Sequence, residues 1–449
     1  EHIEKATTRA AALRKNLKVP AAARKAPSWL WFQNDLQLTA TFNLKVNETG
    51  IYRVTYETLK TAGLDLKGVP ITKVTITNRG KQIPVYVAGK SKFGPGSFIE
   101  FYGEALDTIY TDTNIYTLQV SRTRASRVKE TNASPPRKVT PSTSYIHTLT
   151  VNNQRAYANY APGEDAWYDT RMLVYTTPKT WKIPFQVNGL ANASAPATLD
   201  LIVWGVTDWP ESPDHHLIVS VNGTTVADQT FNGLVEKNIV VTLPAGALHE
   251  GENLLELNLP GDTGVKYDLV NLDRFSLTYQ RSLQAVDGQL TFDAAGKAVK
   301  VTNLPGKNVV VYRMSADGTL VRLKKVQVQA SGKTYTATFA GTGNTVAKYF
   351  VTTTDALYSP VVEATRLDAD LDRPAQYLII SHPDFIDGLQ PLVRARQAQG
   401  LSVSVVDVTD VYAQYAGGIF DPQAIRDYIA FAARRLGTEY VLLVGGDTY

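Results

Sequence analysis

The sequence predicts a multidomain protein in which β-sandwich domains precede an incomplete α/β domain with a parallel sheet. The composition supports this class, because 23 Tyr, 14 Phe, 31 Gly and 22 Pro among 449 residues favour strands and turns over helical bundles. Short alternating apolar runs separated by turn signals fill residues 36–354. Continuous apolar runs separated by helical periodicity follow residue 375. The length is enough for three or four domains.

The first 35 residues predict a basic amphipathic helix and a linker. Apolar residues at helical spacing run from Ile3 to Leu17, and residues 1–30 hold seven Lys and Arg against two Glu. The rest of the chain is close to neutral. Because no nucleic-acid motif accompanies the charge, we expect no nucleic-acid partner. No apolar run is long enough for a membrane span.

Residues 36–121 predict a small β domain. Alternation over Leu38–Val46, a turn at 47–50 and alternation from Tyr52 to Tyr56 indicate a hairpin. Asp107, Asp112 and Asn114 offer oxygen ligands for a structural calcium ion, although this spacing is more typical of hydrogen-bonded turns.

Residues 122–144 predict an exposed linker, and residues 145–283 an antiparallel, jelly-roll-like β-sandwich. Residues 284–356 predict a further small β-sandwich domain. Trp204 and Trp209 are candidates for stacking on a sugar ring, but tryptophans of a sandwich are more often core residues. His215 and His216 make a weak metal pair, because neighbouring residues of a strand point to opposite faces.

Two further motifs fail on inspection. Gly341-Thr-Gly343 resembles the start of a dinucleotide fingerprint, but Val346 occupies the third glycine position and no helix is signalled. The run Asp368–Asp372 has the opening spacing of a calcium loop, but the glycine position is Arg373 and the last acidic position is Ile379. Residues 357–375 therefore predict a solvated connector.

Residues 376–449 predict three parallel strands and two helices in the order β-α-β-α-β. The strands are Gln376–Ser381, Leu401–Asp407 and Tyr440–Gly445. One helix runs over Phe385–Gln399 with an interruption at Pro391, and the second begins after Asp421 and stops at Gly437.

Such sheets bind ligands at the carboxyl ends of their strands. His382 lies there with Asp384 and Asp387, and Asp447 follows the third strand. A lone histidine in this place is more often a structural hydrogen bonder. Because a three-stranded half-sheet leaves an apolar edge open, we expect more sequence to follow Tyr449.

These runs resemble the start of the gingipain-type cysteine peptidase domain. The matching stretches are Tyr377–Phe385 (YLIISHPDF), Gln399–Asp407 (QGLSVSVVD), Gly417–Asp427 (GGIFDPQAIRD) and Tyr440–Asp447 (YVLLVGGD). Upstream, Phe93–Gly103 (FGPGSFIEFYG) and Asp107–Tyr116 (DTIYTDTNIY) resemble the β-rich region that precedes that domain in many secreted members.

The resemblance implies a caspase-like fold and a cysteine–histidine dyad. In that family the two catalytic residues lie on later strands, and this chain contains no cysteine. No catalytic, cofactor-binding or metal-binding residue is therefore assigned to it.

The resemblance favours the amino-terminal portion of a bacterial, secreted or cell-surface cysteine endopeptidase, with its Cys-His dyad beyond Tyr449. Its expected partners are a protein or peptide substrate and the remainder of the peptidase domain. Without the nucleophile, the chain alone is expected to be inactive. Two alternatives stay open: a non-catalytic surface or adhesion protein with glycan- or protein-binding β modules, and a sortase-like transpeptidase of the same fold.

Overall fold

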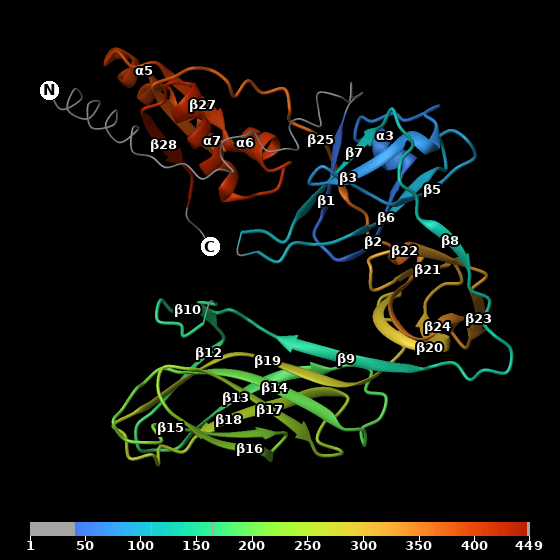
Figure 1. Ribbon diagram of the computed structural model, residues 1–449, viewed down its shortest axis with the longest axis vertical. Coiled ribbons are helices and arrows are strands. Elements are labelled where there is room, and N and C mark those ends of the chain that lie inside the picture. The colour runs from blue at the N-terminus through green and yellow to red at the C-terminus, as the bar shows by residue number, and fades with distance from the viewer. Residues whose placement is uncertain (1–40, 109, 164, 447–449) are drawn as a thin grey trace. The chain divides into compact units, whose positions relative to one another are not determined.

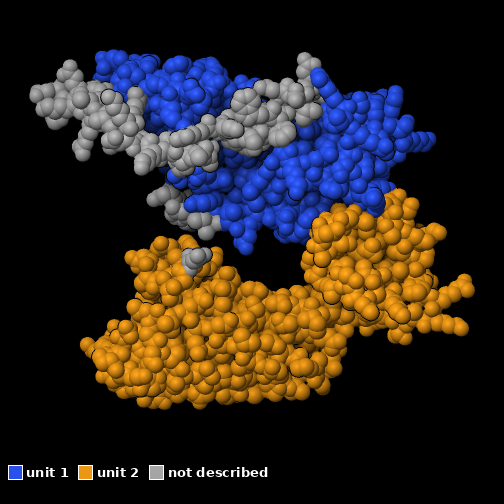
Figure 2. Space-filling model, in the orientation of Figure 1, with its two compact units in different colours: residues 1–129, 357–449 blue, residues 130–356 orange. Residues whose placement is uncertain are grey.

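The computed structural model describes residues 41–108, 110–163 and 165–446 (Figure 1). The predicted helix and linker of residues 1–35 lie outside this range. The chain divides into two compact units, Glu1–Lys129 with Leu357–Tyr449 and Glu130–Ala356 (Figure 2). Strands in several sheets make up most of the regular structure of both units, so the prediction of a multidomain, β-rich protein is confirmed.

The β part of the first unit is built from two antiparallel sheets. One has the order β25-β1-β7-β3-β4 and the other β2-β6-β5. Apolar side chains from both sheets share one core, which includes Leu44, Val54 and Phe101. The elements are β1 (Phe42–Val46), β2 (Gly50–Thr55), α3 (Tyr56–Thr61), η2 (Ile71–Lys73), β3 (Val74–Asn78), β4 (Lys81–Ile83), β5 (Val85–Ala88), β6 (Phe98–Gly103), β7 (Asn114–Val120) and β25 (Val361–Ala364).

The predicted hairpin between β1 and β2 is wrong. β1 pairs with β7 and β25, whereas β2 pairs with β6 in the other sheet. The Tyr52 hydroxyl accepts a hydrogen bond from the Glu48 amide and donates one to its carbonyl, which fixes the turn between the sheets. Alternation correctly marks the buried faces of both strands, but it carries no information about which strand is the partner.

Part of the segment predicted as an exposed linker is packed. Ala125 and Val128 are buried, and the Arg127 guanidinium donates to the carbonyls of Ile71 and Val74. β8 (Lys129–Asn132) then pairs with β22 (Leu320–Lys324) in another sheet. The polar composition of this segment predicted exposure, because the sequence does not show that Arg127 finds carbonyl acceptors more than fifty residues away.

The second unit contains an antiparallel sandwich with jelly-roll topology. Its sheets have the orders β12-β19-β14-β17 and β13-β18-β15-β16, and β9 adds to β19 (Figure 1). Alternating apolar residues of both sheets form its core. The strands are β9 (Ser144–Val151), β10 (Ala156–Tyr157), β11 (Trp167–Tyr168), β12 (Thr170–Val174), β13 (Lys179–Val187), β14 (Ala197–Gly205), β15 (His215–Val221), β16 (Thr224–Phe231), β17 (Glu236–Leu243), β18 (Gly251–Leu259) and β19 (Asp268–Ser282).

The same unit holds a further sheet of order β20-β24-β21-β22-β8, with β23 paired to β24. Gly341 and Gly343 lie inside β24, which explains why no dinucleotide-binding turn forms. A Cβ on Gly341 would stand 2.2 Å from the Gly296 carbonyl oxygen, so this close approach of β24 to β20 requires glycine. The strands are β20 (Gln289–Leu304), β21 (Val309–Met314), β22 (Leu320–Lys324), β23 (Gln327–Ser331) and β24 (Thr334–Thr353), with the 3-10 turn η3 (Thr354–Ala356) after them.

The last segment is a three-stranded parallel sheet of order β27-β26-β28 with helices around it. The predicted helix after Asp421 is confirmed, because the Asp421 carboxylate accepts from the Gln423 amide at 2.9 Å. The interruption near Pro391 is also confirmed. The elements are β26 (Tyr377–Ser381), α4 (Pro383–Ile386), η4 (Asp387–Leu389), α5 (Gln390–Ala398), β27 (Val403–Asp407), α6 (Val408–Tyr415), α7 (Pro422–Arg435) and β28 (Tyr440–Val444).

The helix α6 was not predicted, so the order β-α-β-α-β lacks one element. Asp407 both ends β27 and caps α6, since its carboxylate accepts from the Thr409 amide at 2.8 Å. Because no residues separate β27 from α6, the change from strand to helical periodicity is hard to detect in the sequence. None of the described helices is both long and apolar enough to cross a membrane.

Candidate functional site

The carboxyl edge of the parallel sheet is the first candidate site. Ser381 ends β26 and is fully buried, and its hydroxyl donates to the His382 carbonyl at 2.9 Å. His382 caps α4, because its Nδ1 accepts from the Asp384 amide at 3.3 Å. The His382 side chain is 51% exposed, and Asp384 Oδ2 lies 3.6 Å from its Nδ1. His382 is thus a helix cap at the position where a parallel sheet binds ligands.

Asp407, at the end of β27, is committed to structural bonds. Its Oδ1 accepts from the Thr409 hydroxyl at 2.7 Å, and its Oδ2 lies 2.8 Å from the Arg366 guanidinium. Arg366 also reaches Asp410 at 2.7 Å. The edge therefore presents a histidine and paired carboxylates, and the sequence offers no thiol to act with them.

Two of the three predicted calcium ligands of the small β domain bond to neighbouring groups of the protein. Asn114 is buried and donates to the Glu104 carbonyl at 2.8 Å, while its oxygen accepts from Asn78 at 2.9 Å. Asp112 accepts from the Thr113 hydroxyl, and Asp107 is exposed. Across the parts of the chain that the structure describes, no group of three or more His, Cys, Asp or Glu could hold a metal ion.

The acidic connector also bonds locally. Asp370 accepts from the Asp372 amide at 3.1 Å and from the Arg373 side chain at 3.1 Å. The prediction that residues 357–375 are a solvated connector is wrong in part, because β25 pairs with β1 inside this segment and Leu371 and Ala375 are buried.

A cleft of about 500 Å³ lies within the first unit. One wall is the outer face of the β1, β3 and β7 strands, and the other comes from the ends of α6 and α7. Mostly neutral polar side chains line it, together with Arg79, Asp421 and Asp427. Sequence reasoning missed this cleft because its walls are some 300 residues apart in the chain.

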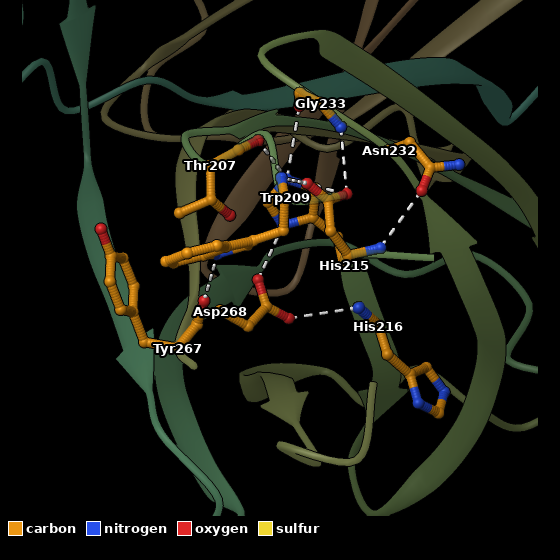
Figure 3. Close-up of polar contacts among 9 residues, drawn as sticks. Thr207, Trp209, His215, His216, Asn232, Gly233, Tyr267 and Asp268 are labelled. Atoms are coloured by element: carbon orange, nitrogen blue, oxygen red, sulfur yellow. Dashed lines mark hydrogen bonds and ion pairs between the residues drawn. The ribbon is translucent and has the colours of Figure 1, made fainter. Parts of the chain in front are cut away.

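The two adjacent histidines of β15 point to opposite faces, as predicted. His215 is fully buried, and its Nδ1 lies 2.7 Å from Asp268 Oδ1 (Figure 3). Its Nε2 lies 3.3 Å from the carbonyl oxygens of Thr207 and Gly233. His216 instead bonds Asp262 and Asp228 on the outer side, both at 2.8 Å.

The surroundings of His215 favour its charged form. Burial alone would lower the pKa of this imidazole, but Asp268 and then Asp214 raise it more, so that the net shift is upward from 6.5. Both ring nitrogens face acceptors, which only the doubly protonated imidazolium can satisfy. The buried His215 thus holds strand and loop ends together in surroundings that favour its cationic form.

The two candidate tryptophans have different roles. Trp204 is fully buried and packs on Tyr168, as expected for a core residue. Trp209 lies on the loop between β14 and β15 and is only partly buried. Its indole donates to the Tyr267 carbonyl at 2.9 Å (Figure 3). Its amide donates to Asp214 at 3.1 Å.

Asp273 should make the jelly roll less stable as the pH rises. Its carboxyl is fully buried. Burial raises its pKa to about 6, with Asp165 and Glu236 adding to the rise against Arg274. Because the folded pKa lies above the ordinary 3.8, the stabilisation is complete below that value and is lost as the pH rises through about 6.

We expect a loss of about 1–3 kcal/mol in the free energy of unfolding over this range. The Asp273→Asn variant, which cannot ionise there, should lack this step. Urea titrations at a series of pH values measure this loss of stability. An equal loss in the Asp273→Asn variant would contradict its assignment to the Asp273 carboxyl.

Comparisons with known proteins bear on both units. A family model for peptidase family C25 matches residues 370–449. The crystal structure of dimeric latent PorU from Porphyromonas gingivalis matches with 16% identity and a TM-score of 0.57, over 91% of this chain and 41% of that chain. The chain thus spans less than half the length of that protein. No curated protein matches.

A β-porphyranase of glycoside hydrolase family 86 from Bacteroides plebeius also matches, with 15% identity over 55% of this chain and 36% of that chain. Its TM-score of 0.19 is too low to indicate a shared fold. The PorU match does show a shared fold, over most of the chain. With the family match at residues 370–449, the resemblance to the gingipain-type cysteine peptidases is therefore confirmed.

Proposed function

We propose that the chain is the amino-terminal portion of a secreted gingipain-like cysteine endopeptidase. Within this proposal, residues 36–356 supply β domains ahead of the first half of a caspase-like peptidase domain at 376–449. The observation that carries it is the family match at 370–449, which falls on the parallel sheet of order β27-β26-β28.

The proposed mechanism needs a thiol that this chain does not contain. A histidine deprotonates a cysteine and the thiolate attacks the peptide carbonyl; the C–N bond breaks as the amine leaves with the proton from the histidine, which gives a thioester acyl-enzyme. Water, deprotonated by the same histidine, then hydrolyses the thioester to the free acid and restores the thiol. Both residues are placed beyond Tyr449. The segment at hand would position them through the carboxyl edge of β26, β27 and β28. The proposed location is the exterior or surface of a bacterium, and the proposed substrate is a protein or peptide.

The test compares the natural protein with the 449-residue chain. Intact mass and peptide mapping should show a longer natural polypeptide with a Cys and a His after Tyr449. It should cleave casein in a way that iodoacetamide abolishes and a serine-directed reagent does not. The 449-residue chain, which lacks cysteine, should show no thiol-dependent cleavage.

Two outcomes would contradict the proposal. One is iodoacetamide-sensitive proteolysis by the 449-residue chain with no other chain present. The other is a natural protein whose later residues contain no cysteine. In the second case catalysis is excluded, and the β domains become the place to look for a function.

A further inference from the structure

Four loops meet at one end of the jelly roll, and we call them the rim. They are residues 175–178, 206–214, 232–235 and 260–267, which follow or precede the strands β12 to β19. Strand pairing brings them together, because Val174 is opposite Asp268 and Gly205 is opposite Val270. Loops on a rigid sandwich are common places for binding sites.

Three aromatic side chains of the rim contact one another. The ring centroids of Trp209 and Tyr267 are 5.0 Å apart with an interplanar angle of 86°. Tyr175 approaches Tyr267 at 6.1 Å and 62°, and it is 60% exposed. Trp209 and Tyr267 are partly buried. The rim therefore offers rings in different planes, of which Tyr175 is the most open.

Hydrogen bonds to buried side chains hold the rim loops in place. The buried His215 joins the start of β15 to Asp268 of β19 and to the carbonyls of Thr207 and Gly233 in two of the loops. Asp214 accepts from the Gly233 amide at 3.0 Å and from the Trp209 amide at 3.1 Å.

Close backbone packing fixes a third loop. A Cβ on Gly261, whose φ is +69°, would stand 2.9 Å from the Tyr175 carbonyl oxygen. The aromatic rings are thus carried on loops with fixed backbones, which lowers the entropy lost when a ligand binds.

The rim and the strand ends next to it are acidic, because Asp208, Glu211, Asp214, Asp262 and Asp268 outnumber Lys266, His215 and His216. Asp214 and Asp268 face the His215 imidazolium, and Asp262 pairs with His216. The remaining charged residues of the four loops, Asp208, Glu211 and Lys266, are exposed. Such a surface disfavours an anionic ligand.

One hydroxyl supports a polar ligand. Thr207 is 6% exposed, and its hydroxyl has no hydrogen-bond partner in the protein. Figure 3 places its side chain beside the Trp209 ring. Buried hydroxyls normally have a partner, and this one lies beneath the surface, so a water that bridges it to a ligand hydroxyl would complete this group.

We propose that the jelly-roll rim binds a neutral oligosaccharide, with pyranose rings packed on Tyr175 and Trp209 and hydroxyls bonded to the polar groups beside them. Sugar rings combine apolar C–H faces with neutral hydroxyls, which is the combination that this surface offers. The proposal does not depend on peptidase activity.

The experiment titrates the full 449-residue chain with cellohexaose, β-1,4-mannohexaose and chitohexaose in turn, by calorimetry and tryptophan fluorescence. At least one of them should bind with a Kd below about 5 mM. The Tyr175→Ala variant should weaken that binding about tenfold, since a lost ring contact costs roughly that much.

Tyr157→Ala is the matched control. Tyr157 is 63% exposed, its ring contacts that of Trp167 at 5.6 Å, and it lies on the β10–β11 hairpin, outside the four rim loops. Its removal should leave binding unchanged. The proposal is overturned if none of the three hexaoses binds, if Tyr157→Ala weakens binding as much as Tyr175→Ala, or if tetramethylammonium binds the rim more tightly than the sugars.

Discussion

Replacing His215 with Gln is expected to lower the free energy of unfolding of the jelly roll by about 3–5 kcal/mol, because it leaves buried carboxylates without their cation. Asp268 and Asp214 both approach the imidazole and are almost fully buried. Glutamine has a similar volume, so the loss of charge dominates over the loss of packing. Urea denaturation followed by tryptophan fluorescence measures it, since four of the six tryptophans lie between residues 145 and 283.

His216→Gln is the control for this prediction. His216 sits on the next residue of the same strand with two carboxylate partners, but those carboxylates are more than half exposed. Exposed ion pairs contribute little, so this variant should lose less than about 1 kcal/mol. Equal losses in the two variants would show that His215 is not a buried cation.

The pH dependence of the same variants gives an independent check. The folded pKa of His215 lies above its ordinary value of 6.5, with Asp268 as the main cause of the rise. The stabilisation is therefore complete below pH 6.5 and is lost as the pH rises through the folded pKa. His216, raised by Asp262 and Asp228 against burial, changes in the same direction. His215→Gln should remove the larger part of this alkaline loss and His216→Gln the smaller part.

The second large effect is expected in the first unit, where Glu100→Ala should cost about 3–5 kcal/mol. Glu100 is fully buried and pairs with the Arg53 guanidinium across β2 and β6. Arg53 also lies 4.1 Å from the centre of the Phe98 ring. Removing the carboxylate leaves a mostly buried guanidinium without its counter-ion. Hydrogen exchange of the β2 and β6 amides measures the loss of stability.

Glu363→Ala provides the comparison within the same β domain. Glu363 pairs with Lys45 at 2.8 Å across β25 and β1, and the two side chains are 50% and 40% exposed. Its removal should cost at most about 1 kcal/mol. If the β2 and β6 amides are as well protected from hydrogen exchange in the Glu100→Ala variant as in the Glu363→Ala variant, the Arg53–Glu100 pair does not stabilise the fold as described.

Local signals in the sequence located most elements near the carboxyl end. The helix α7 follows from Asp421, Pro422 and Gly437, each of which acts within one turn of the chain. The opposite orientation of His215 and His216 follows from the period of a strand. These features depend on neighbours in the sequence, so they can be predicted without knowledge of the fold.

Features that depend on distant partners were missed or wrong. The hairpin at residues 47–50 failed because β1 pairs with β25, more than 300 residues away in the sequence. The charge on His215 needs Asp268 and the carbonyls of Thr207 and Gly233, which the sequence does not place beside it. The polar cleft of the first unit likewise has walls from both ends of the described chain.

The sequence by itself determined the periods of the strands, the helix ends, the absence of a thiol and the resemblance to the gingipain-type peptidases. Only the tertiary structure decided which strands pair, which carboxylates are buried against a cation, and which aromatic rings share the jelly-roll rim. The physical reason is that side-chain period and capping are set within a few residues. Strand pairing and side-chain burial instead depend on which contacts between distant segments of the chain cover the most apolar surface.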